Sequence, residues 1–318
     1  MSSEMPLDVV TVGEAMALFI AGRSGPLATV DSFHRVTAGA ELNVATGLAR
    51  LGFQVGFISR LGDDSFGQHL LSFLDAQGID RSCVTIDAER PTGFMLKSLQ
   101  TDGSDPKVEY FRKGSAASRL SRADNPMSYC AVSRHLHLTG ISPALGDGVR
   151  ELVFEMAEQA REGGRSISFD PNLRPSLWPS QQAMIETLNQ LAARADLVLP
   201  GLAEGRLLTG RQTPDGIADY YLERGASQVV VKLGADGAHF ADRHGRGTVP
   251  GQRVGKVIDT VGAGDGFAVG VISALLEGQD LRMAATRGNA IGARVVQFPG
   301  DCDGLPDRSQ LMAALRGN

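Results

Sequence analysis

The residues with the clearest potential for chemistry lie near the end of the chain, in the segment Asp259–Asp265, which reads DTVGAGD. Its small residues, followed by the apolar run Gly266–Leu276, predict a turn that leads into a helix. Glycine and alanine would leave the first backbone N–H groups of that helix accessible, and the helix dipole adds positive potential there. The segment therefore predicts an anion site built from backbone and suited to a phosphate group.

Asp265 stands at the edge of this predicted anion site. A carboxylate repels phosphate, but it can accept the proton of a hydroxyl group that attacks a phosphoryl group. Asp265 is therefore a candidate general base. Taken alone, the segment also fits an ordinary glycine turn in which Asp265 is an acidic residue in the first turn of a helix.

Two signatures, one toward each end of the chain, resemble those of the ribokinase-like (PfkB) carbohydrate kinases. Asp259–Ile272 matches the C-terminal signature, in which an Asp-Thr-x-Gly-Ala-Gly-Asp segment runs into a helix. Ala38–Asn43 and the stretch from Gly52 to Gly62 follow the N-terminal signature, although Glu41 stands where a small residue is usual. The resemblance covers nearly the whole chain. It implies an enzyme that transfers the γ-phosphoryl group of ATP to a sugar hydroxyl.

The resemblance also implies roles for individual residues. In the family, the residue that corresponds to Asp265 deprotonates the sugar hydroxyl. The residues that correspond to Gly262, Ala263 and Gly264 hold the transferring phosphoryl group. The nucleotide-binding positions, some of them in a strand and turn beside the nucleotide, correspond here to Asn172, Lys232, Gly234, Gly237, Gly262, Gly264 and Asn289.

The expected cofactors are ATP and Mg²⁺, because phosphoryl transfer needs a divalent ion to neutralise the polyphosphate. Many family members carry an Asn-x-x-Glu motif that is tied to Mg²⁺ and phosphate through water. In this chain Gly201 replaces the asparagine, so only Glu204 is carried over as a metal-associated residue.

Within the family, four segments make the chain most similar to 2-keto-3-deoxygluconate kinases: Gly13-Glu14, Gly39–Asn43, Tyr110–Ala116 and Asp170–Pro175. This resemblance implies a sugar-acid substrate, whose carboxylate suits the bidentate guanidinium group of arginine. The residues predicted to bind the substrate are Gly39, Asn43, Tyr110, Arg112, Arg174, Asp265 and Asp301.

Two other functions stay open at this point. A ketohexose kinase, such as a fructokinase or tagatose kinase, would share the phosphoryl-transfer residues, and Gly93–Lys97 lacks a lid tyrosine that is common in 2-keto-3-deoxygluconate kinases. A non-catalytic sugar or nucleotide sensor could retain the fold, but the intact Asp265 and glycine segment argue against it.

The elements that must position these residues alternate between strand and helix patterns. This alternation predicts an α/β fold with a doubly wound, mainly parallel sheet flanked by helices. The predicted strands are Asp8–Gly13, Gln54–Arg60, Arg134–Thr139, Ser166–Asp170, Asp196–Leu199 and Ser227–Lys232. The predicted helices include Glu41–Leu51, Ser65–Gln77, Gly148–Glu162 and Ser180–Arg194, and a short strand pair is expected after Gly245.

Two segments interrupt the alternation. Ala17–Val36 and Thr92–Lys113 read as extended chain with turns and no intervening helix, which predicts a small β-sheet lid. We therefore expect a core domain made of residues 1–16, 37–91 and 114–318, and a lid made of residues 17–36 and 92–113.

Composition limits the expected partners. The chain has 318 residues and a formal net charge of −5, and its basic residues are dispersed. Nucleic acid and anionic membrane surfaces are therefore not expected partners. No apolar run reaches the length of a membrane helix and Met1–Leu7 lacks the features of a signal peptide, which predicts a cytoplasmic location.

Cysteine and histidine spacing predicts no metal site. Cys83, Cys130 and Cys302 are far apart and odd in number, so we expect structural thiols and no disulfide framework. His135 and His137 would share one face of a strand, where we expect them to be hydrogen-bonded. Because lids of this family often pair between subunits, a homodimer or higher homo-oligomer is also expected.

Overall fold

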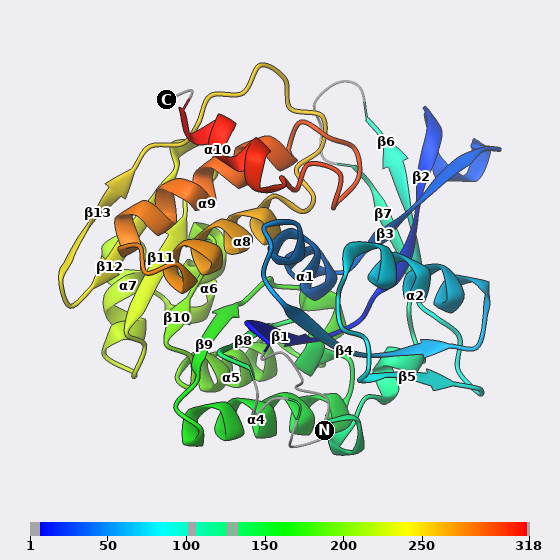
Figure 1. Ribbon diagram of the computed structural model, residues 1–318, viewed down its shortest axis with the longest axis horizontal. Helices are drawn as coiled ribbons and strands as arrows, with labels where there is room; N and C mark the ends of the chain where they lie inside the picture. Colours follow the sequence, from blue (N-terminus) through cyan, green and yellow to red (C-terminus); the bar gives the residue numbers. More distant parts are fainter. Residues whose placement is uncertain (1–6, 101–105, 126–128, 130–132, 317–318) are drawn as a thin grey trace.

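The structure consists of a large sheet with helices on both faces and a smaller sheet beside it (Figure 1). It is a computed structural model that describes residues 7–100, 106–125, 129 and 133–316. This architecture confirms the predicted fold class. In order across the large sheet, the nine strands are β13 (Gly245–Val249), β12 (Ala238–Asp242), β11 (Gln228–Lys232), β10 (Leu197–Val198), β9 (Ser166–Asp170), β8 (His135–Thr139), β1 (Val9–Val12), β4 (Val55–Gly62) and β5 (Val84–Asp87).

Strand order in the large sheet reverses next to β1. From this central strand the chain builds outward through β4 and β5 on one side, and later through β8, β9, β10 and β11 on the other, with all of these neighbours parallel. Binding sites of open parallel sheets lie at the carboxyl ends of the strands beside such a reversal. The topology therefore locates the place where a site is expected.

The edge of the sheet differs from the prediction in one respect. We expected a pair of short strands after Gly245, but only β13 begins there, and its antiparallel partner β12 precedes it. The turn between them is stabilised by Asp242, whose Oδ1 accepts the backbone N–H groups of His244 and Gly245 at 2.7 and 3.0 Å. An aspartate that closes a turn in this way is a local signal that the sequence contained.

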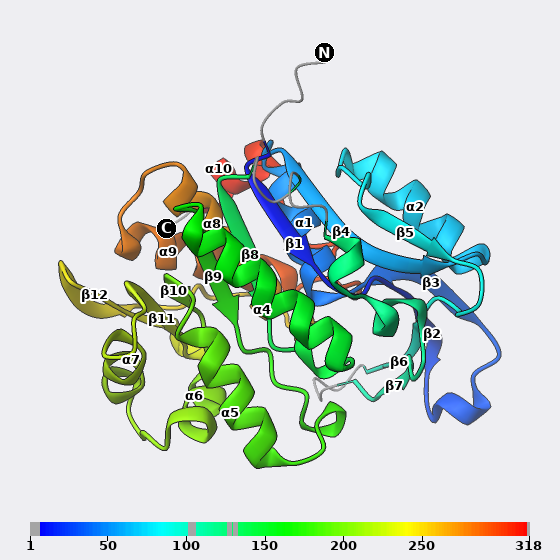
Figure 2. The ribbon, with the colours of Figure 1, turned by 90° about the horizontal axis from the view of Figure 1, so that it is seen from below.

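The helices form a layer on each face of the large sheet, as Figure 2 shows. One layer contains α1 (Ala40–Arg50), α2 (Ser65–Gln77), α8 (Ala263–Leu276), α9 (Leu281–Val295) and α10 (Arg308–Arg316). The other contains α4 (Asp147–Glu162), α5 (Gln181–Ala192), α6 (Leu202–Thr209) and α7 (Pro214–Leu222). Short 3-10 turns cover Leu27–Thr29, Ala116–Arg119, Arg122–Asp124, Ser142–Ala144, Pro175–Leu177 and Gly234–Asp236.

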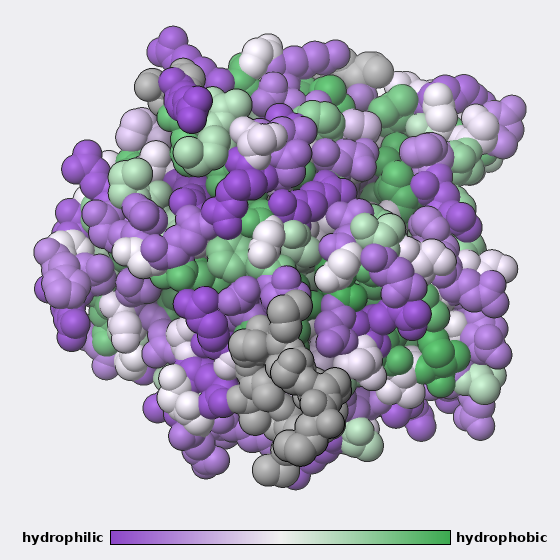
Figure 3. Space-filling model, viewed as in Figure 1, coloured by the Kyte–Doolittle hydropathy of each residue, from purple (hydrophilic) through white to green (hydrophobic). Residues whose placement is uncertain are grey.

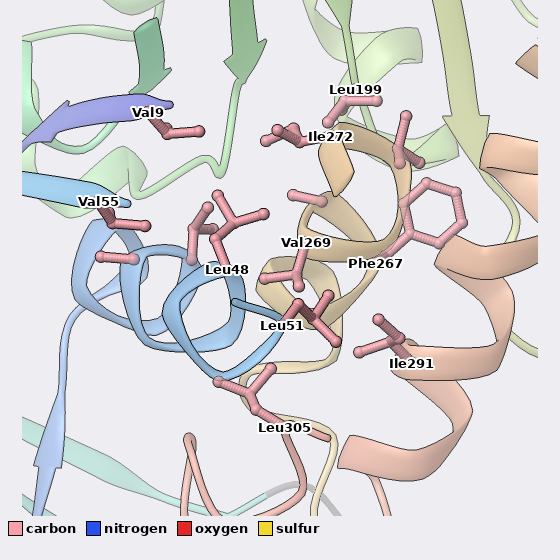
Figure 4. Packing of buried hydrophobic residues seen from close by; sticks show 14 of the residues in the cluster. Val9, Leu48, Leu51, Val55, Leu199, Phe267, Val269, Ile272, Ile291 and Leu305 are labelled. Carbon is pink, nitrogen blue, oxygen red and sulfur yellow. The ribbon is translucent and has the colours of Figure 1, made fainter. Parts of the chain in front are cut away.

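Helix α8 is buried against α1 and α9 along most of its length (Figure 4). Leu48 of α1, Val269 and Ile272 of α8, and Ile291 of α9 belong to one core cluster, and each is at most 1% exposed. Burial of aliphatic side chains of this kind contributes about 1.5–3 kcal/mol for each residue. The core therefore holds the N-terminus of α8, where Asp265 lies, in a fixed position.

The smaller sheet has the strand order β3 (Phe33–Ala38), β2 (Met16–Ser24), β6 (Phe94–Leu99) and β7 (Val108–Phe111). Its outer pairs are antiparallel, whereas β2 and β6 run parallel. A small apolar cluster that includes Met16, Leu18 and Met95 packs within it. In Figure 1 this sheet projects from one end of the large sheet, near α2.

Hydrophilic and hydrophobic side chains are interspersed over the face that Figure 3 shows. Among the described residues, no helix has both the length and the apolar character needed to cross a membrane. Cys83 and Cys302 carry free thiols, as predicted, and Cys130 lies outside the described residues.

Candidate active site

A cavity of about 300 Å³ lies where the carboxyl ends of the parallel strands meet the smaller sheet. It is lined by side chains from α1, from the smaller sheet, from the loop after β9 and from the segment before α8. Every residue predicted to bind the substrate lines this cavity, namely Gly39, Asn43, Tyr110, Arg112, Arg174, Asp265 and Asp301. Gly262 and Gly264, two of the three residues predicted to hold the phosphoryl group, line it as well.

A second cavity, of about 360 Å³, adjoins the first. Its walls are mainly apolar and include Val254, Val257, Phe267 and Val296. Five of the residues predicted on the nucleotide side line it, namely Lys232, Gly234, Gly237, Gly264 and Asn289, whereas Asn172 and Gly262 line the first cavity instead. The two cavities share Lys232, Thr260 and Gly264, so they meet at the turn before α8.

Asp265 is held by two side-chain amides. Its Oδ2 accepts a hydrogen bond from Asn43 Nδ2 at 2.7 Å, and its Oδ1 accepts one from Asn172 Nδ2 at 3.2 Å. Asn43 comes from α1, while Asn172 follows β9 with a φ of 39°. Amides orient the carboxylate without neutralising its charge.

Burial raises the pKa of Asp265 to about 7, although the hydrogen bond from Asn43 and the positive charge of Arg174 act in the opposite direction. The nearby carboxylate of Asp170 adds to the increase. A carboxyl group with a pKa near neutrality is suited to accept a proton in a reaction and to release it afterwards.

The turn before α8 requires glycine at position 262. Gly262 has a φ of 82°, and a β-carbon there would lie 2.8 Å from the backbone oxygen of Asp301. Gly262 lines the first cavity, Ala263 lines the second and Gly264 lines both, so the N-terminus of α8, where the helix dipole favours an anion, lies at the junction of the two cavities. Gly264 faces Lys232 across this junction, since a β-carbon there would lie 3.5 Å from Lys232 Nζ.

Lys232 is the cation at the junction. Its Nζ lies 2.6 Å from Asp170 Oδ2. Burial alone would lower the pKa of Lys232, but the charges of Asp170 and Glu204 outweigh that effect and raise it. The ammonium group therefore stays charged at the point where a phosphate chain would pass from one cavity to the other.

Glu204 lines the first cavity, but both of its oxygens already accept backbone N–H groups. Oε2 accepts from Gly201 at 2.7 Å and caps α6, while Oε1 accepts from Leu173 at 2.8 Å. Asn289 is likewise engaged, because its amide donates to Pro250 O at 2.9 Å and so holds the loop beside the second cavity. Glu204 and Asn289 therefore each stabilise the local backbone, in addition to the metal-associated role predicted for Glu204 and the nucleotide-binding role predicted for Asn289.

The two predicted arginines differ in their surroundings. Arg112 is 8% exposed, and its guanidinium is paired with the buried carboxylate of Glu14, which also accepts from Ser115. Arg174 donates to the backbone oxygen of Leu173 at 2.9 Å, and among the described residues no carboxylate lies within ion-pair distance of it. Of the two, Arg174 is the cation whose charge is left for a ligand.

The unusual Glu41 is accommodated below the site. Its buried carboxyl group accepts hydrogen bonds from Thr139 Oγ1 at 2.6 Å and Ser142 Oγ at 2.5 Å. Room for it comes from Gly13, where a β-carbon would lie 2.3 Å from Glu41 Cδ. Burial raises its pKa despite these hydrogen bonds. The sequence shows the departure at position 41 but not the glycine on another strand that permits it.

His135 and His137 form a hydrogen-bonded group within the sheet, as expected. Ser168 Oγ lies 2.8 Å from a ring nitrogen of each, and Ser166 Oγ lies 2.7 Å from the other ring nitrogen of His135. Burial lowers their pKa values to about 4 and about 3, so both rings are neutral. Within the described part of the chain, no three His, Cys, Asp or Glu side chains are grouped as metal ligands.

Several residues that shape the site lie in segments named above but had no individual role predicted for them. Glu14 and Ser115 hold Arg112, Asp170 holds Lys232, and Lys97 is paired with both Asp259 and Asp301 beneath the smaller sheet. A signal for Lys97 was present, because it is the one charged residue of the strand Phe94–Leu99. Its partners could not be inferred, because they lie more than 160 residues away in the sequence.

Comparison with known proteins places these features in a family. Residues 6–308 match the model of the pfkB family of carbohydrate kinases. The 2-dehydro-3-deoxygluconokinase of Bacillus subtilis (strain 168) is 52% identical over 312 residues, which cover 98% of this chain and 96% of that protein. Fructokinase-1 of Oryza sativa subsp. japonica is 31% identical over 316 residues, covering 96% of this chain and 97% of that protein.

Two solved structures are similar over almost their whole length. The PfkB protein from Polaromonas sp. JS666 superimposes with a TM-score of 0.90 at 52% sequence identity, covering 96% of this chain and 99% of that chain. A putative ribokinase II from E. coli, in complex with ATP and Mg²⁺, gives a TM-score of 0.90 at 25% identity, covering 98% of this chain and 100% of that chain.

Proposed function

Because the chain belongs to the pfkB family of carbohydrate kinases, we propose that it transfers the γ-phosphoryl group of ATP to a hydroxyl of 2-dehydro-3-deoxygluconate, also called 2-keto-3-deoxygluconate. The 52% identity to the Bacillus subtilis kinase supports this substrate. The observation that carries the proposal within the site is Arg174, a cation without a carboxylate partner among the described residues, in the same cavity as Asp265.

Asp265 is the proposed general base. The acceptor hydroxyl attacks the γ-phosphorus, its proton passes to the Asp265 carboxylate, and the bond between the γ-phosphorus and the bridging oxygen breaks to release ADP. The amides of Asn43 and Asn172 would keep the carboxylate aimed at that hydroxyl. Its pKa of about 7 leaves it able to take up the proton near neutral pH.

The backbone of Gly262, Ala263 and Gly264 would hold the transferring phosphoryl group, with Lys232 beside it. Backbone donors fixed by a helix N-terminus stabilise developing negative charge without having to reorganise. The apolar second cavity, with Gly234, Gly237 and Asn289 in its wall, is then the proposed place for the nucleoside of ATP. The similar structure that holds ATP and Mg²⁺ supports this nucleotide.

Mg²⁺ fits the site as a companion of the nucleotide. Such an ion is commonly bound by one or two carboxylates, substrate phosphates and water, and it would neutralise the polyphosphate charge. Glu204 is the residue proposed to hold it, through water, since both Glu204 oxygens already accept backbone N–H groups.

The sugar acid would lie under the smaller sheet, which we propose acts as a lid formed by residues 17–36 and 92–113 over a core of residues 1–16, 37–91 and 114–318. Tyr110 would offer its hydroxyl from β7, and Asp301 would close the far end. Tyr110 and Phe111 are 45% and 47% exposed. Exposed aromatic residues on a small sheet support the proposal of a homodimer that pairs through the lids.

The substrate proposal is tested by kcat/KM for 2-dehydro-3-deoxygluconate, fructose and tagatose. A charged hydrogen bond contributes about 1.5–3 kcal/mol, so Arg174→Ala should raise KM for the sugar acid at least about tenfold and affect a neutral ketohexose far less. Arg112→Ala is the matched comparison, and because it leaves Glu14 buried without its partner, we expect its main effect on thermal stability.

A higher kcat/KM for fructose or tagatose would contradict the sugar-acid proposal and favour a ketohexose kinase, the function named by the more distant fructokinase relative. It would leave the family assignment unchanged. Absence of turnover on every sugar and sugar acid would favour a sensor function.

A further inference from the structure

Lys97 is a fully buried lysine in the middle of strand β6, with a side chain that is 1% exposed. Its Nζ lies 2.6 Å from Asp259 Oδ2 and 2.8 Å from Asp301 Oδ1, and it donates to Pro299 O at 2.8 Å. An ammonium group has three N–H donors, so these three oxygens account for all of them. We call this group of oxygens, from Asp259, Asp301 and Pro299, the cation cradle.

The ammonium group of Lys97 stays charged. Burial alone would lower its pKa, but the charges of Asp301 and Asp259 outweigh burial and raise the pKa above its ordinary value. Lysine is seldom buried fully, and a buried ion pair is often no more stabilising than apolar residues of similar volume. The conformation that this group fixes is therefore a better reason for its presence than stability alone.

The partners of Lys97 border the turn before α8 on both sides. Asp259 opens the DTVGAGD segment, and its second oxygen accepts the N–H of Val261 at 2.9 Å. Asp301 packs against Gly262, since a β-carbon at Gly262 would lie 2.8 Å from the backbone oxygen of Asp301. One ammonium group thus holds both walls of the turn proposed to bind the phosphoryl group.

Lys97 itself belongs to the sheet above that turn. It lies opposite Ile20 of β2 and Val108 of β7. Met95 and Tyr110, from the same β6–β7 pair, line the first cavity. The distance between β6 and the turn therefore sets how closely the roof of the cavity approaches the phosphoryl-binding backbone.

We propose that Lys97 is a positioning residue, a tethered internal cation that fixes the smaller sheet to the turn before α8 and so aligns the acceptor hydroxyl with the phosphoryl group. Lys97 lines neither of the two cavities, so it acts through Asp259 and Asp301. The proposal rests on the phosphoryl-binding role proposed for Gly262–Gly264. It implies that the cation cradle must be filled and that the chain itself supplies the cation.

The test is chemical rescue of Lys97→Ala, which leaves space at the three oxygens. Its kcat should fall about 10²-fold or more, while KM for ATP changes less than about threefold, because the lost group aligns the reactants and lies outside the nucleotide cavity. Ammonium or methylammonium chloride should restore kcat at least about tenfold. Tetramethylammonium chloride at equal ionic strength should not restore kcat, because the tetramethylammonium ion is too large for the cation cradle and donates no hydrogen bond.

Lys107→Ala is the matched control, since Lys107 is a lysine of the adjacent strand connection whose side chain is 71% exposed. It should behave as wild type in every salt. A folded Lys97→Ala with wild-type kcat, or with a loss that no small cation reduces, would overturn the proposal.

Thermal unfolding supplies a readout that does not depend on turnover. The melting temperature of Lys97→Ala should rise with ammonium and not with tetramethylammonium, and the same response to both ions would count against a cation cradle. If wild type turned over no sugar at all, the proposed function would fail while this measurement still tested the cradle.

If Lys97→Ala does not fold, the wild-type protein supplies the test. With tetramethylammonium as the sole monovalent cation, the wild-type protein should be fully active, because Lys97 already occupies its cation cradle. A requirement for potassium, sodium or ammonium would overturn the proposal.

Discussion

Two buried carboxylates border the same cavity and have opposite surroundings. Asp265 is bound by the neutral amides of Asn43 and Asn172, and burial raises its pKa to about 7. Asp301 is bound by the ammonium group of Lys97 at 2.8 Å. Burial raises the pKa of both carboxylates, but the charge of Lys97 acts against that increase at Asp301, whereas the two amides bring no charge to Asp265.

Within one fold, the aspartate side chain can therefore serve as a base at one position and as a structural anion at another. Burial penalises the charged form of each carboxylate, and both hydrogen bonds and a nearby opposite charge act against that penalty. Amides fix orientation and leave the proton affinity high, which suits catalysis. An ammonium group also fixes orientation, and its charge acts against the increase in pKa that burial causes at Asp301, which suits a contact that joins two loops.

The largest expected effect comes from Asp265→Asn, which removes the base and keeps the shape. We expect kcat to fall about 10²–10⁴-fold, with ATP binding largely unchanged, because a general base contributes about that much. Steady-state kinetics and nucleotide titration measure the two quantities. More than about a tenth of wild-type kcat would show that Asp265 is not the base.

The same substitution also tests the comparison through stability. The pKa of Asp265 in the folded protein, about 7, lies above its ordinary value of 3.8, so the folded state binds the proton more tightly and loses stability as pH rises from about 4 to about 7. At about pH 8, Asp265→Asn should therefore raise the melting temperature. Asp301→Asn should lower it, because Lys97 would stay buried with one charged partner fewer, and this loss outweighs the gain from removing a buried carboxylate whose pKa is also raised. Equal shifts of the same sign would show that the two carboxylates do not differ.

A smaller effect is expected from Gly264→Val, in the turn between the two carboxylates. A β-carbon is tolerated there, 3.5 Å from Lys232 Nζ, but the valine methyl groups would fill the junction of the cavities. The folded variant should lose about 3 kcal/mol of barrier lowering, or roughly a hundredfold in kcat. Gly245→Val, where no heavy atom lies within 4 Å of the new β-carbon, is the control. Full activity of folded Gly264→Val would show that the segment is only a turn.

The smallest effect concerns pH. Since Asp265 acts in its deprotonated form, kcat/KM should fall as pH drops through about 7. Asn43→Ala removes a hydrogen bond that lowers the Asp265 pKa, so this acid limb should move to higher pH. Asn172→Ala should move it less, because its hydrogen bond is longer, 3.2 Å against 2.7 Å. A limb that stays in place or moves to lower pH in Asn43→Ala would contradict the assigned role of that amide.

Local patterns in the sequence account for the parallel core, and the family resemblance accounts for the predicted residues that line the two cavities. The six predicted strands of the large sheet are present, although the span predicted as Asp196–Leu199 is only Leu197–Val198, and the span predicted as Gln54–Arg60 is Val55–Gly62. Hydrophobic periodicity marks the interior of a strand well and its ends poorly, because terminal residues depend on their neighbours in the sheet.

A short stretch of chain is enough to encode the turn at Gly262, the helix that follows it, and the acidic residue at the start of that helix. The partner of each charged group, in contrast, depends on how distant parts of the chain fold together. Arg112 and Arg174 look alike in sequence, yet one faces Glu14 and the other faces the cavity. The physical reason is that proton affinity and free charge depend on burial and on groups brought together by folding, such as Asn43 and Asp265, which lie 222 residues apart in the chain.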